Sequence, residues 1–459
     1  MMFPSGQSLW QKEDDGPNSP RGATLMAWDF ETEPEFQEKL DWTDAFVRRE
    51  VEPLDLAFRD TAAPYDRRNP VYKKITDPLK AEVRKHGLWA CHLGPELGGP
   101  GYGQVKLALL NEILGRSMWA PNIFGCQAPD SGNAEILAHY GTEEQKRKYL
   151  QPLLDGDIVS CFSMTEPQGG ADPREFRCRA VRDGDSWVID GEKYFSSHAD
   201  LAEFLIAMAI TNPDVPVHQG ASMFLVPRDT PGLNIVRLAG LGHEPLGHGH
   251  HAYIRYEGVR VPRENLLGGE GQGFLIAQTR LGGGRIHHAM RNVATVRQAL
   301  QMMCERALSR RTQGGPLAEK QLVQQAIADS FIQLEQFRLL VLYAAWHIDK
   351  GHKDAARTYI AAVKVQTAEV LHDVVRRALH VHGALGCSNE MPLAHMWMTV
   401  PVMGIADGPS EVHKVTVAKQ VLKQYRPYEG LWPRAFLPER VAEARARFAE
   451  HLEREVGNL

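Results

Sequence analysis

A turn near the carboxyl end of the chain carries the residue best placed for acid–base chemistry. The stretch 402–414 reads VMGIADGPSEVHK, with apolar residues on one side of Asp407 and a Gly-Pro pair on the other. A carboxylate shielded from water is a better base, so this setting favours proton abstraction. Two other interpretations stay open: Asp407 caps the helix that follows, or Glu411 is the acting carboxylate.

A glycine-rich stretch at 162–173, FSMTEPQGGADP, could admit a flat ligand. Glycines expose backbone N–H groups and let a ligand approach the main chain, although a plain glycine-rich loop has the same pattern. Some twenty residues later, GEKYFSSH (191–198) places the aromatic Phe195 and two hydroxyls at the end of a predicted strand.

Several histidines also need an interpretation. One group alternates with glycines and has no cysteine or carboxylate to complete a zinc set, so we expect no metal there; it comprises His243, His248, His250 and His251. His287 and His288 follow Arg285, and they either approach a substrate or pack in the interior.

The elements that must position these residues change along the chain. Composition favours a disordered extension over residues 1–32 and a mixed-charge helical tail over 426–459. Helical periodicity predicts an N-terminal helical domain (33–155) and a C-terminal four-helix bundle (271–425). Between them, at 156–270, apolar and polar residues alternate with a period of two, which predicts strands, and Asp-Gly at 183–184 predicts a hairpin. The fold class is therefore α+β with a middle antiparallel β domain.

Composition excludes several classes of protein. The 459 residues are 43% hydrophobic and carry a net charge of −5, which gives no reason to expect a nucleic-acid partner. No apolar run is long enough to span a membrane. The six cysteines are scattered, so we expect reduced thiols in a cytoplasmic protein. No strand is followed by GxGxxG and a helix, so a Rossmann site is not expected.

Six ordered motifs resemble the acyl-CoA dehydrogenase family over roughly residues 35–425. They read CFSMTEPQGGADP, IDGEKYFSSHAD, GFLIAQTRLGGGRIHHAMR, ALSRRT, LHVHGALG and ADGPSEVH. The segments RLGGGRIHH and ADGPSEVHK are similar to those of one branch of the family. In vertebrates that branch is fused to a kinase-like domain and linked to 4-hydroxyacyl-CoA breakdown.

The resemblance implies FAD as the cofactor, bound by residues from both halves of the chain. Phe195 stands where the family has a Trp, Ala171 where it usually has Ser, and Gln313 where it has Phe, so three contacts are altered. The implied flavin contacts are Phe162, Met164, Thr165, Gly170, Ala171, Phe195, Ser196, Ser197 and Glu411. A neighbouring subunit would contribute Arg310, Thr312, Gln321, His380, Gly383 and Ala384.

For catalysis, the resemblance implies that Asp407 stands where the family has its catalytic glutamate. Ala171, Arg285 and Gly408 would contact the acyl-CoA substrate. Asp is shorter than Glu by about 1.5 Å, so either the turn compensates or the substrate differs from a plain acyl chain. Some family members carry the base at the position of Gly284, which cannot serve.

The expected function is α,β-dehydrogenation of an acyl-CoA, plain or substituted, within fatty acid β-oxidation. Electrons would pass to an electron-transferring flavoprotein, and a shared FAD implies a homodimer or homotetramer. Two alternatives keep the scaffold: a flavin-dependent oxidase of the acyl-CoA or nitroalkane type, and a non-catalytic flavin- or CoA-binding protein.

Overall fold

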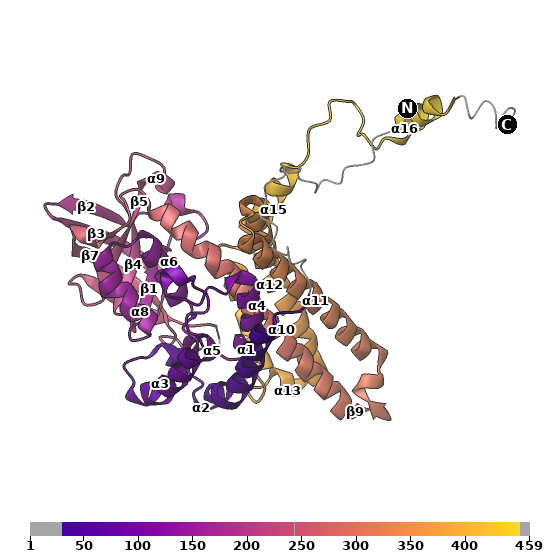
Figure 1. Cartoon of the computed structure of the whole chain (residues 1–459), viewed down its shortest axis with the longest axis horizontal. Helices are drawn as coiled ribbons and strands as arrows, with labels where there is room; N and C mark the ends of the chain where they lie inside the picture. Colours follow the sequence, from indigo (N-terminus) through magenta and orange to yellow (C-terminus); the bar gives the residue numbers. More distant parts are fainter. Residues whose placement is uncertain (1–29, 243, 450–459) are drawn as a thin grey trace.

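The computed structural model describes residues 30–242 and 244–449. The extension expected over 1–32 thus lies outside the described residues, apart from its last three. Figure 1 shows N-terminal helices beside a β-sheet, a bundle of long helices, and a C-terminal helix, α16 (Leu437–Arg447), apart from the main body.

The N-terminal part is helical, as predicted. Pro or a capping side chain starts several of its helices: Asn69 caps α3 through the amide of Val71, and Thr142 forms a capping box with Gln145 at α7. The α-helices are α1 (Pro34–Phe46), α2 (Glu52–Ala57), α3 (Pro70–Lys85), α4 (Gly103–Leu114), α5 (Ala120–Ile123), α6 (Asp130–Tyr140), α7 (Glu143–Gln145) and α8 (Gln151–Asp155).

The middle part is an eight-stranded sheet with the order β6-β7-β3-β2-β4-β5-β8, in which β1 also pairs with β4. The pairing is antiparallel except that β4 runs parallel to β1 and to β2. The predicted hairpin is confirmed, with Gly184 at φ +60° between β2 and β3. The strands are β1 (Ser160–Ser163), β2 (Arg179–Asp183), β3 (Ser186–Ser197), β4 (Phe204–Ile210), β5 (Ala221–Pro227), β6 (Leu233–Ala239), β7 (His251–Pro262) and β8 (Leu266–Leu267), with a short helix α9 (Val217–Gly220) before β5.

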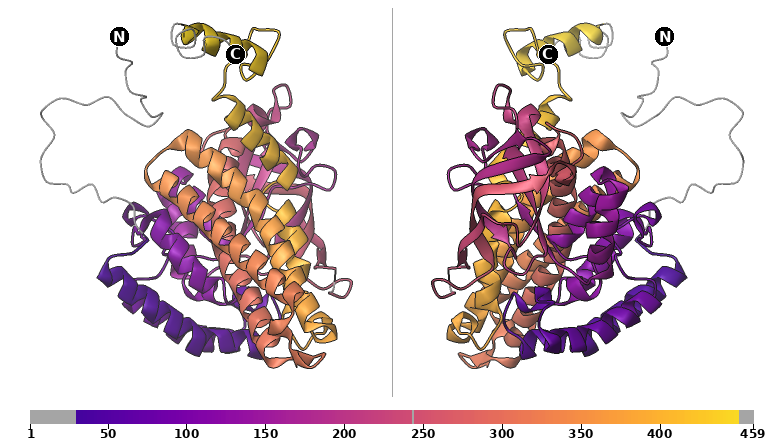
Figure 2. Two further views of the ribbon diagram at one scale, coloured as in Figure 1. Left: turned by 90° about the vertical axis from the view of Figure 1, so that its right-hand side faces the viewer. Right: turned by 90° about the vertical axis from the view of Figure 1, so that its left-hand side faces the viewer.

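The bundle is built around α12, which packs against every other long helix of this part. The turn that holds Asp407 divides the fourth helix of the bundle in two. The left view of Figure 2 shows the bundle helices running alongside one another in front of the sheet. The helices are α10 (Gly273–Ser309), α11 (Gln321–Asp349), α12 (Lys353–His382), α13 (Ala384–Cys387), α14 (Leu393–Ile405) and α15 (Ser410–Leu422), with a small hairpin, β9 (Arg311–Thr312) and β10 (Gly315–Pro316), after α10.

The hydrophobic core explains how the three parts meet. One cluster of buried side chains joins the N-terminal helices to the bundle, including Leu110, Met290 and Val374. A second covers one face of the sheet, and a third joins its other face to α6 and the start of α10, through Ile136 and Ile276. Therefore α6, β1 and the start of α10 converge on one region. No helix of the described residues has both the length and the apolarity needed to cross a bilayer.

Candidate active site

The turn between α14 and α15 fixes Asp407 in an unusual backbone conformation. Its φ is +56°, in the left-handed region that Asp and Asn tolerate better than other side chains, and Gly408 follows at φ +101°. The residue that precedes α15 is Pro409, and no side chain caps that helix. The interpretation of Asp407 as a helix cap is therefore wrong, because the turn sets it too early in the chain to reach the first amides.

Neighbouring side chains hold the main chain of this turn. Arg285 Nε donates to the carbonyl of Asp407 at 2.9 Å, and His413 Nε2 lies 3.3 Å from the same oxygen. Lys364 donates to the carbonyl of Met403 in the last turn of α14. Within the described residues nothing accepts from the amide N–H of Asp407, which leaves that donor for a ligand.

The carboxylate of Asp407 points toward α10. A Cβ built on Gly284 would lie 2.9 Å from Asp407 Oδ2, and only 16% of the side chain is exposed. His288 Nε2 lies 3.8 Å from the same oxygen. Burial lowers the pKa of His288, although Asp407 opposes the shift, and this disfavours the charged form of its ring. Glu411, in contrast, lies exposed in the first turn of α15.

A second carboxyl group, which the sequence analysis missed, faces the same stretch of α10. Glu135 Oε2 would lie 3.0 Å from a Cβ built on Gly283, the neighbour of Gly284. Burial raises the pKa of Glu135 to about 7, although nearby Arg280 opposes the shift. The signal in the sequence was one carboxylate inside the otherwise apolar run AEILA of α6.

Arg280 connects the two ends of the site. Its guanidinium carbon lies 4.0 Å from the ring centroid of Phe162 on β1, and its Nε donates to Asn133 on α6 at 2.8 Å. The α6 helix is itself fastened to β1, because the amide and hydroxyl of Ser160 both donate to Asp130. The structure thus brings Phe162 close to the Asp407 region, although 245 positions separate them.

The raised pKa of Glu135 predicts a pH-dependent stability. A carboxyl whose pKa is about 7 in the folded chain stabilises that chain below its unfolded value near 4.5, and this contribution is lost as the pH rises through about 7. We expect the melting temperature of the wild type to fall relative to that of Glu135→Gln between pH 5 and pH 8. Arg280 and Asp407 are present in both proteins, and burial lowers the pKa of His287, so these neighbours do not produce the difference. Parallel melting curves would contradict the assignment.

Phe162, Met164, Thr165, Gly170 and Phe195 form a surface beside the sheet, here called the cradle, that fits FAD. Phe195 at φ +59° stacks on Tyr194, yet 57% of it remains exposed, so its ring can cover a flat ligand. The amide of Tyr194 donates to the carbonyl of Thr165, which holds the Met164–Thr165 segment against β3. A Cβ on Gly170 would meet only Thr165 Cγ2, at 3.9 Å, so its backbone is open, and Ala171 beside it is exposed.

Two of the predicted flavin contacts have hydroxyls that are already engaged. Ser196 is buried and hydrogen-bonds Ser163, which also accepts from Tyr256. Ser197 Oγ lies 2.9 Å from His251 Nδ1. Both hydroxyls therefore already have protein partners.

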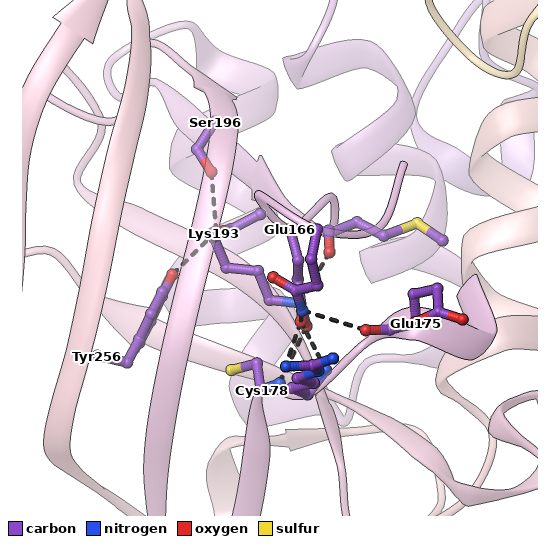
Figure 3. Close-up of polar contacts among 10 residues, drawn as sticks. Glu166, Glu175, Cys178, Lys193, Ser196 and Tyr256 are labelled. Carbon is purple, nitrogen blue, oxygen red and sulfur yellow. Dashed lines mark hydrogen bonds and ion pairs between the residues drawn. The ribbon is translucent and has the colours of Figure 1, made fainter. Parts of the chain in front are cut away.

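A buried ion pair, also missed, fixes the same cradle. Lys193 Nζ lies 2.8 Å from Glu166 Oε1 and donates to the carbonyl of Met164 at 2.7 Å, and Glu166 accepts from the amides of Arg177 and Cys178 (Figure 3). The side chains of Lys193 and Glu166 are 0% and 1% exposed. Strand alternation gave a signal, since Lys193 shares the inward phase of Trp187 and Ile189.

The residues expected to bind FAD in another subunit lie elsewhere. They sit where α10 and α12 end and α11 begins, which is one end of the bundle because successive helices alternate in direction (Figure 1). The exposed residues there are Arg310, Thr312, Gln321, His380, Gly383 and Ala384. A single chain does not bring them to the sheet, so the prediction of a shared cofactor requires a second copy.

The histidine-rich loop shows no metal set among the residues that the structure describes. His250 instead stacks parallel to buried His198, which stacks on Tyr65. His243 lies outside the described residues, and His248 is exposed. His287 is buried, 3.3 Å from Gln104 Oε1.

Comparison with known proteins gives matches along nearly the whole chain. Sequence models of the acyl-CoA dehydrogenase N-terminal, middle and C-terminal domains match residues 33–157, 161–255 and 271–422. FadE2 of Mycobacterium tuberculosis, which carries the name of an acyl-CoA dehydrogenase, is 44% identical over 86% of this chain and 93% of its own.

Two further matches differ in coverage. Acyl-CoA dehydrogenase family member 11 of Rattus norvegicus is 40% identical over 84% of this chain, which spans only 50% of that relative's length. A solved structure from Mycobacterium abscessus, described as an acyl-CoA dehydrogenase, is 36% identical with a TM-score of 0.79, covering 86% of this chain and 100% of that one.

Proposed function

The chain belongs to the acyl-CoA dehydrogenase family, and we propose that it converts an acyl-CoA to the 2-enoyl-CoA, with Asp407 taking the α-proton. As a member of this family it is an FAD-dependent oxidoreductase. The observation that carries the proposal is the Asp407 turn, which is held by Arg285 and directs a mostly shielded carboxylate at Gly284.

The chain's own groups have separate tasks in this reaction. The Asp407 carboxylate receives the α-proton, and its amide N–H can donate to the thioester carbonyl, where negative charge develops. The lowered pKa of His288, caused by burial, disfavours a positive charge on the ring beside Asp407. Gly284, without a side chain, gives the base and the substrate room. When bound, FAD supplies the acceptor for the hydride that leaves the β carbon.

The cradle of Phe162, Met164, Thr165, Gly170 and Phe195 would hold the flavin. Arg285 uses its Nε on the Asp407 carbonyl, so a contact with CoA would come from its remaining guanidinium nitrogens. The residues at the end of the helical bundle of a second copy would complete the FAD site, in a homodimer or homotetramer. An electron-transferring flavoprotein would accept the electrons, and fatty acid β-oxidation is the process served.

The proposal predicts rapid anaerobic bleaching of the flavin by an acyl-CoA. The purified protein should be yellow, and a panel of CoA thioesters of different chain length and substitution should include members that reduce the flavin within a turnover. Stopped-flow absorbance measures the rate, with free CoA as the control. A colourless protein that gains no thermal stability from FAD would support the non-catalytic alternative.

The electron acceptor needs its own measurement. Reduced flavin that returns to the oxidised state at catalytic rates in air indicates an oxidase. Slow reaction with oxygen, together with fast reaction with an electron-transferring flavoprotein, indicates a dehydrogenase.

A further inference from the structure

The helix end that leads into the Asp407 turn has little apolar packing. Among the described residues of α14, only Leu393 and Val400 are buried, and Ile405 at its end is exposed. Pro401 lies inside the helix and has no N–H, so one backbone hydrogen bond of this helix is missing. An element with few buried apolar contacts opens at a low cost in free energy, so its position depends on the side chains that hold its carbonyls.

Lys364 reaches this helix end from inside the bundle. It lies on α12 and is 4% exposed, and its ammonium group donates to the carbonyl of Met403, four positions before Asp407. Among the described residues it forms no ion pair, unlike buried Lys193, which pairs with Glu166. Burial lowers the pKa of Lys364, although nearby Asp407 opposes the shift.

A buried ammonium group whose partner is a carbonyl and not a carboxylate is costly, and an apolar side chain of similar length would avoid this cost. Folding alone therefore does not explain a lysine at this position. We infer that Lys364 is a positioning residue, which holds the last turn of α14 so that the Asp407 carboxylate stays directed at α10. This inference rests on the proposed function.

The contacts of Lys364 and those of Arg285 act at different points of the turn. Arg285 and His413 hold the carbonyl of Asp407 itself, from α10 and α15. Lys364 holds the helix end from which the turn starts, from α12. Loss of Lys364 should therefore let the base shift while its own backbone contacts remain.

The test compares the same substitution at two buried lysines. Lys364→Met removes the donor and keeps most of the side-chain length, whereas Lys80→Met makes the change on α3, where buried Lys80 lies over Trp89. We expect Lys364→Met to reduce its flavin about 10–100-fold more slowly, because a displacement of about 1 Å can cost about 100-fold. Its flavin content and its affinity for the 2-enoyl-CoA product should change little, and its melting temperature should not fall. Lys80→Met should react at the wild-type rate.

Two further measurements separate positioning from a structural role. Lys364→Arg, which keeps a donor, should recover part of the rate. Hydrogen exchange gives a readout without turnover, because the amides of residues 403–409 should exchange faster in Lys364→Met than in the wild type or in Lys80→Met.

Several results would overturn the role given to Lys364. They are a Lys364→Met protein that reacts at the wild-type rate, one that does not fold or melts well below the wild type, and an equal loss of rate in Lys80→Met. If no thioester bleaches the flavin of the wild type, the proposed function has failed, and the exchange comparison still tests whether Lys364 holds the turn.

Discussion

Asp407→Asn should leave a yellow, folded protein that binds acyl-CoA but reduces its flavin about 10²–10⁴-fold more slowly, the usual contribution of a positioned general base. Asn is the suitable replacement because it tolerates the left-handed φ of +56°, whereas Ala would add backbone strain. The amide also keeps the volume of the side chain. Anaerobic stopped-flow measures the rate, and product binding and melting temperature establish that the site is intact.

Glu411→Gln is the matched comparison, since Glu411 is the rival carboxylate four positions away. It is exposed and lies beyond the turn, so the rate of proton removal should change little. If Glu411→Gln stops bleaching and Asp407→Asn does not, the base has been misassigned.

The position of the Asp407 carboxylate can be tested separately by a substitution at Gly284 on α10. Gly284→Ala would place a methyl group 2.9 Å from Asp407 Oδ2 and force the carboxylate to move. A displacement of about 1 Å can cost about 100-fold in rate, so this variant should be slow although its base is intact.

Lys193→Met should destabilise the protein by about 3–5 kcal/mol, because it leaves Glu166 buried without its counter-charge. It also removes the donor to the Met164 carbonyl, so the segment that carries Thr165 should loosen and FAD affinity should fall. Chemical denaturation measures the first effect, and flavin retention on gel filtration measures the second.

Two variants show whether burial is the cause. The double variant Glu166→Gln with Lys193→Met should recover part of the stability, since no charge is left unpaired. Arg182→Met breaks a surface pair with Glu270 in the same domain and should change the free energy of unfolding by about 1 kcal/mol or less. Equal losses for Lys193→Met and Arg182→Met would contradict the role given to the buried pair.

The sequence by itself determined the order of the elements and indicated Asp407 as the candidate base. Alternation of apolar residues located β3 to β7, the Asp-Gly pair located the hairpin, and long helical periodicity located the bundle. These signals are local, since strand and helix periods are set by neighbours a few positions away. The turn around Asp407 was equally readable, because Gly-Pro after a carboxylate ends one helix and starts another.

Only the tertiary structure decided which charged side chains share a space. Glu135 and Asp407 are 272 positions apart, and both lie against the same stretch of α10 because α6 is fastened to β1 and packs against the start of α10. Lys193 and Glu166 pair because β3 carries one beside the loop that carries the other. Such proximity depends on how separate elements pack, so local sequence patterns do not predict it. The sequence of the turn could indicate Asp407 as a candidate base, but the proximity of Glu135 appeared only with the packing.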